Sequence, residues 1–177
     1  MPRMAYDFTK FKKSLSGAEE WVKKEFTGIR TGQANPALLD SINVRSLGSI
    51  MTEGPRTLRI TPWDTSAIKE IEKTITMANL GVSVSVDEKG LRINFPDLTA
   101  ERRVEIMKIA KEKLEEGKKQ IRIHRDEIMK DLKSKQKSGG LGEDEVHRHE
   151  KEVQKMVDEV NKKLEELYSK KEKEIKA

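Results

Sequence analysis

The chain has 177 residues, of which 34% are hydrophobic and 38% are charged. Globular domains typically have about 45 to 50% apolar and about 25% charged residues, so we expect a thin core and a wide surface, as in elongated helices. The absence of cysteine excludes disulfides, thiolate metal sites and cysteine nucleophiles, and the net charge of +5 is too small to demand a polyanionic partner.

The first predicted element is a helix that extends from the N-terminal region to Arg30. Its apolar residues recur in steps of three and four, which is the spacing of one helix face. These residues are Met4, Phe8, Phe11, Leu15, Ala18, Val22, Phe26 and Ile29. Gly32 and Pro36 then predict a stop and a turn, and Arg30 would be a cation at the C-terminus of the helix.

The pattern then changes to an alternation of apolar and polar residues, which is typical of half-buried antiparallel strands. Such runs lie at residues 42–44, 58–60, 82–86 and 91–95. A loop that ends at Gly90 joins the last two runs into a hairpin. Between the second and third runs, a short helix is expected to begin at Asp64 or Thr65 and to end near Gly81.

Two longer helices are predicted after this module. Thr99 can cap the first of them. Its apolar stripe consists of Met107, Ala110, Leu114, Gly117, Ile121, His124 and Ile128. A glycine-rich turn at residues 138–142 then precedes a helix with its own apolar stripe. That stripe consists of Val146, Val153, Met156, Val160, Leu164, Leu167 and Ile175.

Three helices with one apolar stripe each should pack on one another as a bundle. We therefore predict an α+β protein in which residues 1–31 and 99–177 form an elongated three-helix bundle. Residues 32–98 form an inserted small β/α/β domain, joined to the bundle by two short segments that can act as hinges. The candidate hinge residues are Thr31, Gly32, Pro36, Pro96 and Leu98.

Basic residues recur along one side of the second long helix, and we call this set the basic stripe. It consists of Lys108, Lys111, Lys118, Arg122 and Arg125, interrupted only by Glu115. Such a stripe can follow nucleic-acid phosphates, and the two arginines are spaced to grip phosphate bidentately. The alternative is that these are solvated charges, partly paired with neighbouring glutamates.

No catalytic or metal-binding constellation is recognisable. His147 and His149 are two positions apart on a helix and face nearly opposite directions, so we expect both to be solvated surface residues rather than metal ligands. His124 lies on the apolar stripe and is expected to be packed. Trp63 is expected to be buried beneath the short helix rather than to stack on a base. We therefore expect neither enzyme activity nor a cofactor.

The assembled motifs resemble the bacterial ribosome recycling factor family along the whole chain. The matching segments are IRTGQANPALLD at residues 29–40, PRTL at 55–58, PWD at 62–64, LTAERR at 98–103, Arg122 with Arg125, and GEDEV at 142–146. The resemblance implies an L-shaped, tRNA-sized molecule with a hinged β/α/β domain. It also implies that Arg30, Arg122 and Arg125 contact RNA, and Lys111 and Lys118 of the basic stripe are added as further candidates.

The resemblance further implies a partner and a role. The family binds ribosomes after termination, in the intersubunit space and against large-subunit rRNA. With elongation factor G and GTP it splits the subunits, so that mRNA and tRNA leave. We accordingly expect a monomeric protein of the bacterial cytoplasm with no membrane partner.

Two departures from the family pattern and two alternative functions stay open. The segment 44–54 is shorter than in the family, and Asp126 stands where relatives have a second, adjacent arginine. One alternative is a hibernation or protection factor that occupies the same ribosomal RNA without splitting subunits. The other is a coiled-coil adaptor that binds proteins, for which the basic stripe would be incidental.

Overall fold

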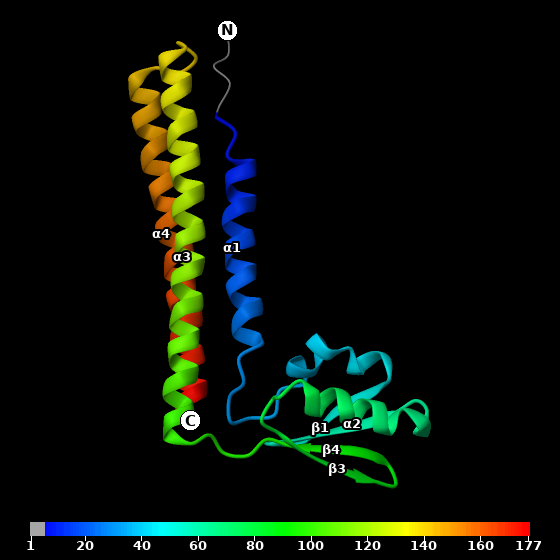
Figure 1. Cartoon of the computed structure of the whole chain (residues 1–177). Coiled ribbons are helices and arrows are strands. Elements are labelled where there is room, and N and C mark those ends of the chain that lie inside the picture. The colour runs from blue at the N-terminus through cyan, green and yellow to red at the C-terminus, as the bar shows by residue number, and fades with distance from the viewer. Residues whose placement is uncertain (1–5) are drawn as a thin grey trace. The chain divides into compact units, whose positions relative to one another are not determined.

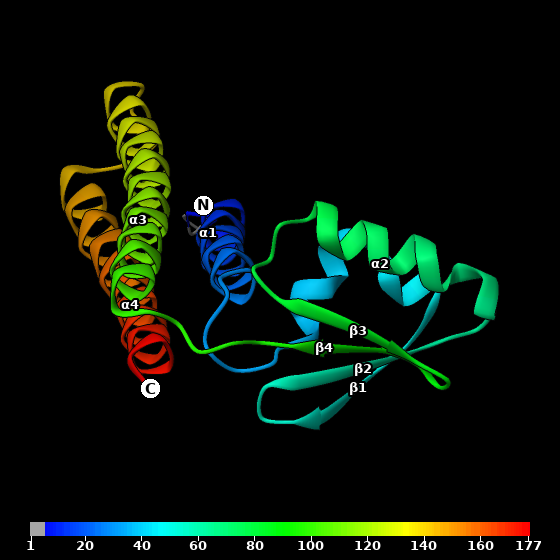
Figure 2. The same ribbon diagram turned by 60° about the horizontal axis from the view of Figure 1, so that its bottom comes forward.

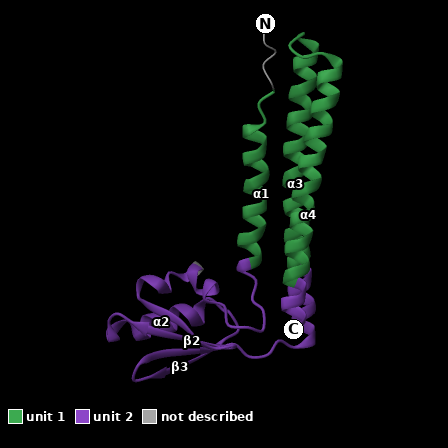
Figure 3. Cartoon of the chain, turned by 180° about the vertical axis from the view of Figure 1, so that it is seen from behind, with its two compact units in different colours: residues 1–26, 109–171 green, residues 27–108, 172–177 purple. Residues whose placement is uncertain are grey.

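The computed structural model describes residues 6–177. Its contacts divide the chain into two compact units, coloured separately in Figure 3. Unit 1 comprises residues 1–26 and 109–171, and unit 2 comprises residues 27–108 and 172–177. The domain boundaries at 31/32 and 98/99 come from the sequence pattern and stay a prediction.

Unit 1 is formed by parts of three helices, which run side by side in Figure 1. They are α1 (Thr9–Thr27), α3 (Ala100–Lys137) and α4 (Glu143–Lys176). α3 begins after Thr99, whose hydroxyl accepts a hydrogen bond from the Arg102 amide at 3.2 Å, as the sequence predicts. No helix in residues 6–177 combines the length and the apolar character that crossing a membrane requires.

The prediction that the first helix continues to Arg30 is wrong. α1 begins at Thr9, where the Asp7 carboxylate accepts a hydrogen bond from the Thr9 amide at 2.8 Å, and it ends at Thr27. Gly28 follows directly, and glycine is the residue that most weakens a helix short of proline. Met4, the first residue of the predicted stripe, lies outside the described residues.

The apolar stripes of α1, α3 and α4 form the core of unit 1. The most deeply buried members are Leu15, Ala18, Val22, Ala110, Leu114, Ile121, Leu132, Val153 and Leu164. Salt bridges at the edges of this core join Lys113 to Glu25 at 3.0 Å and Lys163 to Glu19 at 3.6 Å. The predicted packing of the three stripes on one another is therefore confirmed within unit 1.

Unit 2 contains a four-stranded antiparallel sheet with helices against one face (Figure 2). The strands are β1 (Gly48–Gly54), β2 (Thr57–Pro62), β3 (Ser83–Asp87) and β4 (Gly90–Asn94), in the spatial order β1-β2-β4-β3. The short helix α2 (Ile68–Met77) follows a turn in which the Asp64 carboxylate accepts from the Ser66 amide at 2.9 Å. The α+β class and three of the predicted runs are confirmed.

The predicted strand at residues 42–44 is wrong. This part of the chain forms two short 3-10 helices, Pro36–Ile42 and Val44–Ser46. Asn43 between them has a φ of 54°, a left-handed conformation that breaks an extended run and that asparagine tolerates. The edge strand β1, which follows, was not predicted.

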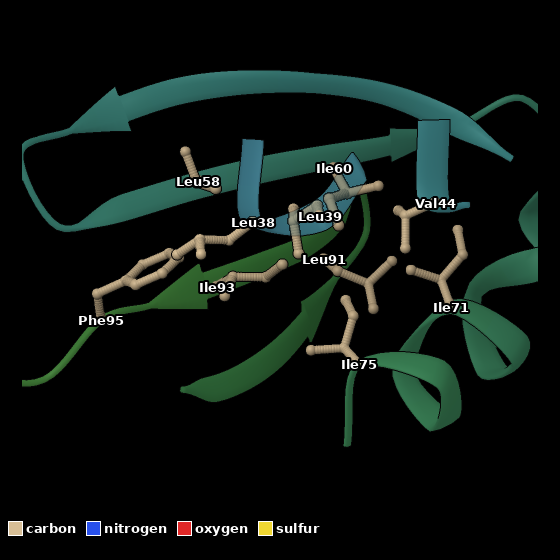
Figure 4. Packing of buried hydrophobic residues seen from close by; sticks show 10 residues of the cluster. All are labelled: Leu38, Leu39, Val44, Leu58, Ile60, Ile71, Ile75, Leu91, Ile93 and Phe95. Atoms are coloured by element: carbon tan, nitrogen blue, oxygen red, sulfur yellow. The ribbon is translucent and has the colours of Figure 1, made fainter. Parts of the chain in front are cut away.

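The core of unit 2 lies between the sheet and its helices, as Figure 4 shows. Alternate residues of β2 and β4, namely Leu58, Ile60, Leu91 and Ile93, are fully buried. They pack with Ile71 and Ile75 of α2 and with residues of the first 3-10 helix. The helices therefore cover the apolar side of the sheet.

The other side of the sheet carries a network of four charged side chains. Arg59 donates to Asp87 through both terminal nitrogens at 3.0 Å, and its Nε donates to Glu53 at 3.0 Å. Arg92 lies directly opposite Arg59 in the β2–β4 pair and donates to Glu53 at 2.6 and 3.1 Å. The arginines hold the pKa values of Glu53 and Asp87 below their usual ranges through these hydrogen bonds.

The packing at Gly117 generates a first prediction. A Cβ at this position would clash with Val22 Cγ2 and lie 3.5 Å from Leu164 Cδ1, whereas a Cβ at the helical Gly17 would meet nothing within 4 Å. Val22 is β-branched and cannot easily move aside. We expect Gly117→Ala to lower the free energy of unfolding by about 1 to 3 kcal/mol. The control Gly17→Ala should raise it by about 0.5 to 1 kcal/mol. Urea unfolding measures both, and stabilisation by both substitutions would show that the helices do not approach closely at Gly117.

The charge network generates a second prediction, on pH. The pKa values of Glu53 and Asp87 are lower in the folded state than their unfolded-state values of 4.5 and 3.8. The two carboxylates therefore stabilise the fold fully at a pH above the unfolded-state pKa values, and this stabilisation is lost as the pH falls through the lower folded-state pKa values. We expect Glu53→Gln to flatten the loss of stability between about pH 5 and pH 2, measured by thermal unfolding. Glu88→Gln, at an exposed hairpin position, is the control, and equal acid profiles for the two variants would contradict the role of the network.

Candidate nucleic-acid interface

The packing of α3 determines which of its basic side chains face solvent. Successive residues of an α-helix are about 100° apart around the axis. Ala110, Leu114 and Ile121 are buried, so residues on the opposite side of α3 are the most exposed. Arg122 lies about 100° from Ile121 and is exposed.

Arg122 is the least constrained candidate. Its side chain makes no hydrogen bond or ion pair with any residue in the described range 6–177. The neighbouring Lys119 is exposed, and Ile123 is 48% exposed. All five donor hydrogens of the guanidinium group are thus available for a phosphate.

Arg125 lies closer to the packed side of α3 and already has a partner. Its Nε and Nη2 donate to Asp126 Oδ1 at 3.2 and 2.9 Å, and its side chain is 35% exposed. Asp126 therefore partly neutralises the charge that the sequence assigned to phosphate binding. The expected pair of arginines contains one free and one paired guanidinium group.

The two candidate lysines are also engaged, in both cases with α4. Lys118 forms a short hydrogen-bonded ion pair with Glu165 and lies 3.8 Å from Glu115. The Lys111 ammonium lies 5.8 Å from the centre of the Tyr168 ring, which is cation–π range. The part of the basic stripe formed by these lysines is therefore bound to its own bundle.

Arg30 lies in unit 2 and is held by three backbone carbonyl groups. Its Nη1 donates to Leu80 at 3.3 Å and to Gly81 at 2.9 Å, and its Nη2 donates to Pro96 at 2.9 Å. The guanidinium carbon lies 5.9 Å from the centre of the Phe95 ring. Burial lowers the pKa of Arg30, with a smaller contribution from Arg102.

The surroundings of Arg30 leave little room for another ligand. Its Nε is buried and has no hydrogen-bond partner among the described residues. A Cβ at Gly81, where φ is +65°, would lie 2.7 Å from Arg30 Nη1. Sequence reasoning missed this arrangement because Leu80, Gly81 and Pro96 contribute only backbone oxygens.

The candidate hinge residues lie in two segments that Arg30 connects. Thr31 and Leu98 are each 8% exposed, and Pro96 supplies one of the carbonyl acceptors. Pro36 opens the first 3-10 helix, and a Cβ added at Gly32 would meet nothing within 4 Å. These segments are therefore anchored at several points.

Two expectations about side chains outside the stripe are wrong. His149 is 8% exposed rather than solvated, and its ring packs 5.6 Å from Tyr6 and 5.5 Å from Phe8. Trp63 is 71% exposed rather than buried beneath α2. His147 is exposed, as predicted, and His124 is half-buried with its Nδ1 3.4 Å from Glu127.

The signal for His149 was present in the sequence. His149 lies three residues after Val146 and four before Val153, both of which are buried, so it belongs to the same apolar stripe. Among residues 6–177, no group of three or more His, Asp or Glu side chains could hold a metal ion.

The comparisons with known proteins agree on one family. The family model described as "Ribosome recycling factor" matches residues 22–175. A ribosome-recycling factor from Clostridioides difficile is 41% identical over 170 residues, which covers 91% of this chain and 92% of that protein. One from Pelotomaculum thermopropionicum is 42% identical over 165 residues, with 88% and 89% covered.

Solved structures give the same result. A solution structure of ribosome recycling factor aligns with a TM-score of 0.77 at 28% identity and covers 98% of this chain and 99% of that one. The T. thermophilus factor, described with E. coli elongation factor G on the E. coli post-termination complex, aligns with a TM-score of 0.66 at 36% identity, with 95% and 96% covered. This chain belongs to the ribosome recycling factor family.

Proposed function

We propose that this protein binds post-termination ribosomes in the intersubunit space and, with elongation factor G and GTP, promotes subunit dissociation. Release of mRNA and tRNA follows from that step. The observation that carries the proposal is the likeness to ribosome recycling factors over nearly the full chain. One of these relatives is described together with elongation factor G on a post-termination complex.

In this proposal the protein is a non-enzymatic factor that needs no cofactor of its own. The free energy comes from GTP that elongation factor G hydrolyses. One surface of the protein binds ribosomal RNA, and the second unit receives the force that elongation factor G exerts. Thr31, Gly32, Pro36, Pro96 and Leu98 stay the proposed hinge, and glycine at position 32 tolerates a wide range of backbone dihedral angles.

The proposed RNA contact is the outward side of α3, with Arg122 as the strongest contributor. Arg122 does not have to break an internal bond to reach a phosphate. Arg125, Lys111 and Lys118 must first exchange Asp126, Tyr168 and Glu165 for RNA. Exposed ion pairs are worth only about 0 to 1 kcal/mol, so this exchange is feasible but reduces the net gain.

Arg30 fits a different role from the RNA contact that the family resemblance implies. Three of its five donor hydrogens already bind the carbonyl groups of Leu80, Gly81 and Pro96, and its Nε is buried, so little of the guanidinium group is accessible to a phosphate. We therefore assign Arg30 to positioning the two segments that connect the inserted module. This role explains why an arginine is needed, because the planar guanidinium group can donate to several acceptors at once.

The recycling role can be tested by light scattering from purified post-termination ribosomes. We expect the protein to accelerate dissociation only when elongation factor G and GTP are present. Arg122→Gln should weaken binding to 50S subunits about 5-fold at 0.15 M salt and lower the slope of log K against log salt by about 0.8. Dissociation should slow accordingly at limiting protein concentration.

Arg148→Gln is the matched control for Arg122→Gln, because Arg148 is an exposed arginine on α4. Equal binding by the two variants at every salt concentration would remove Arg122 from the interface. Binding that protects ribosomes without splitting them would instead support a hibernation factor and overturn the recycling role.

The role of Arg30 can be tested by Arg30→Lys, which keeps the positive charge but removes the planar guanidinium group. We expect the free energy of unfolding to fall by about 1 to 3 kcal/mol in urea, because charge-assisted hydrogen bonds to two segments are lost. Arg102→Lys is the control, since within residues 6–177 the Arg102 side chain forms only a surface pair with Glu105 at 2.7 Å, and the change should alter stability by less than about 0.5 kcal/mol. No greater loss for Arg30→Lys than for the control would contradict the positioning role.

A further inference from the structure

The outward side of α3 carries a second basic pair beyond Arg122. Lys130 and Lys133 are both exposed, and neither forms an ion pair within the part of the chain that the structure describes. We call them the distal lysine pair. They were not part of the basic stripe predicted from the sequence.

The distal lysine pair repeats the arrangement of Lys119 and Arg122. Each pair is three residues apart, and the second follows the first by eleven residues. Eleven residues correspond to about three turns, so the pairs face the same direction to within about 20° and are about 16 Å apart along the axis. Lys118 and Arg125 lie on the side of Arg122 that turns toward the core, which accounts for their lower exposure.

Nearby carboxylates among the described residues form no ion pair with the distal lysine pair. Three of them lie within one turn of Lys130, and each has another partner. Asp126 accepts from Arg125 at 2.9 Å, Glu127 lies 3.4 Å from His124, and Asp131 lies 3.0 Å from Lys135. Lys133 has no acidic residue three or four positions away on either side.

The acidic first turn of α4 limits how far this surface extends. Glu143, Asp144 and Glu145 directly follow the turn after α3 and oppose the charge of Lys137. Lys130 and Lys133 precede that end of the helix by at least one turn. Between residues 150 and 159, the exposed positions of α4 carry a mixture of acidic and basic side chains.

We propose that the distal lysine pair is a second phosphate-binding point for ribosomal RNA, separate from the one at Arg122. The inference rests on the proposed function and extends its RNA contact along α3. Two like-charged points about 16 Å apart fit a folded polyanion, whose charges recur along its backbone. Lysine suits such a contact because its ammonium group acts as a point charge on a flexible stem.

The test is the salt dependence of binding to purified 50S subunits by the full-length protein. We expect Lys130→Gln/Lys133→Gln to lower the slope of log K against log salt by about 1.5, and to weaken binding about 10-fold at 0.15 M salt. The control is Lys151→Gln/Lys155→Gln, which removes the same charge from exposed positions of α4. Circular dichroism should show equal helix content and thermal unfolding for both variants, since glutamine and lysine have similar helix propensities.

Equal slopes for the distal and control variants would overturn the inference. If Arg122→Gln lowers the slope while the distal variant does not, only the extension along α3 fails and the proposed function stands. If the wild-type protein binds 50S subunits without any salt dependence, the RNA contact fails as a whole. Protein-free 23S rRNA is the second probe: a loss of slope on 50S subunits but not on this RNA would assign the pair to an acidic ribosomal protein and contradict phosphate binding.

Discussion

The burial of one side of α3 against α1 and α4 determines which cations remain for a partner. Gly117 allows Val22 and Leu164 to approach the helix axis, and buried residues before and after it continue the contact. Because this side is filled, the cations at its margins bind groups of the same bundle, as Lys118 and Lys111 do. The cations on the opposite side of α3 face solvent and are available to contact RNA.

This division changes how a basic helix should be interpreted. The basic stripe predicted from the sequence treats Lys118, Arg122 and Arg125 as equivalent, although their environments differ. Arg122 is exposed and unpaired within residues 6–177, Arg125 is paired with Asp126, and Lys118 is paired with Glu165. Phosphate affinity depends on the free energy of releasing the internal partner as well as on charge. The candidate surface is therefore rotated away from the core relative to the predicted stripe.

Arg30 illustrates the same principle inside unit 2. A cation next to a helix end and a glycine-containing turn is compatible with helix capping, RNA contact or a structural role. The three carbonyl groups that accept its hydrogen bonds favour the structural role, because they already pair three of the five donor hydrogens of the guanidinium group. A residue can thus be important in a ribosome-binding protein through the geometry of its own backbone.

Much of the fold could be predicted from periodicity, because long stripes and alternating runs are repeated signals. The boundaries of α3, its Thr99 cap and the β3–β4 hairpin are examples. Short irregular segments could not be predicted in this way. Ile42 and Val44 alternate like a strand, but Asn43 adopts a left-handed conformation between two 3-10 helices.

The edge strand β1 and the environments of single side chains show what sequence patterns lack. Gly48–Gly54 contains few apolar residues, and pairing with β2 alone defines it as a strand. Trp63 follows the end of β2 at Pro62, past the last core residue of that strand, and stays exposed. For the candidate interface, residue types were predictable, but the partners of Arg30, Lys111 and Lys118 depend on contacts between distant segments.

The most direct measurement of the central claim uses a single introduced cysteine, because the chain contains none. An iron chelate attached at Ile123→Cys, on the exposed side of α3, would generate hydroxyl radicals next to the proposed RNA contact in the 50S complex. The same chelate at Glu159→Cys, an exposed position of α4, is the comparison. The account predicts strong local cleavage of 23S rRNA from position 123 and weak cleavage from position 159. Cleavage that is weaker from position 123 than from position 159 would contradict it.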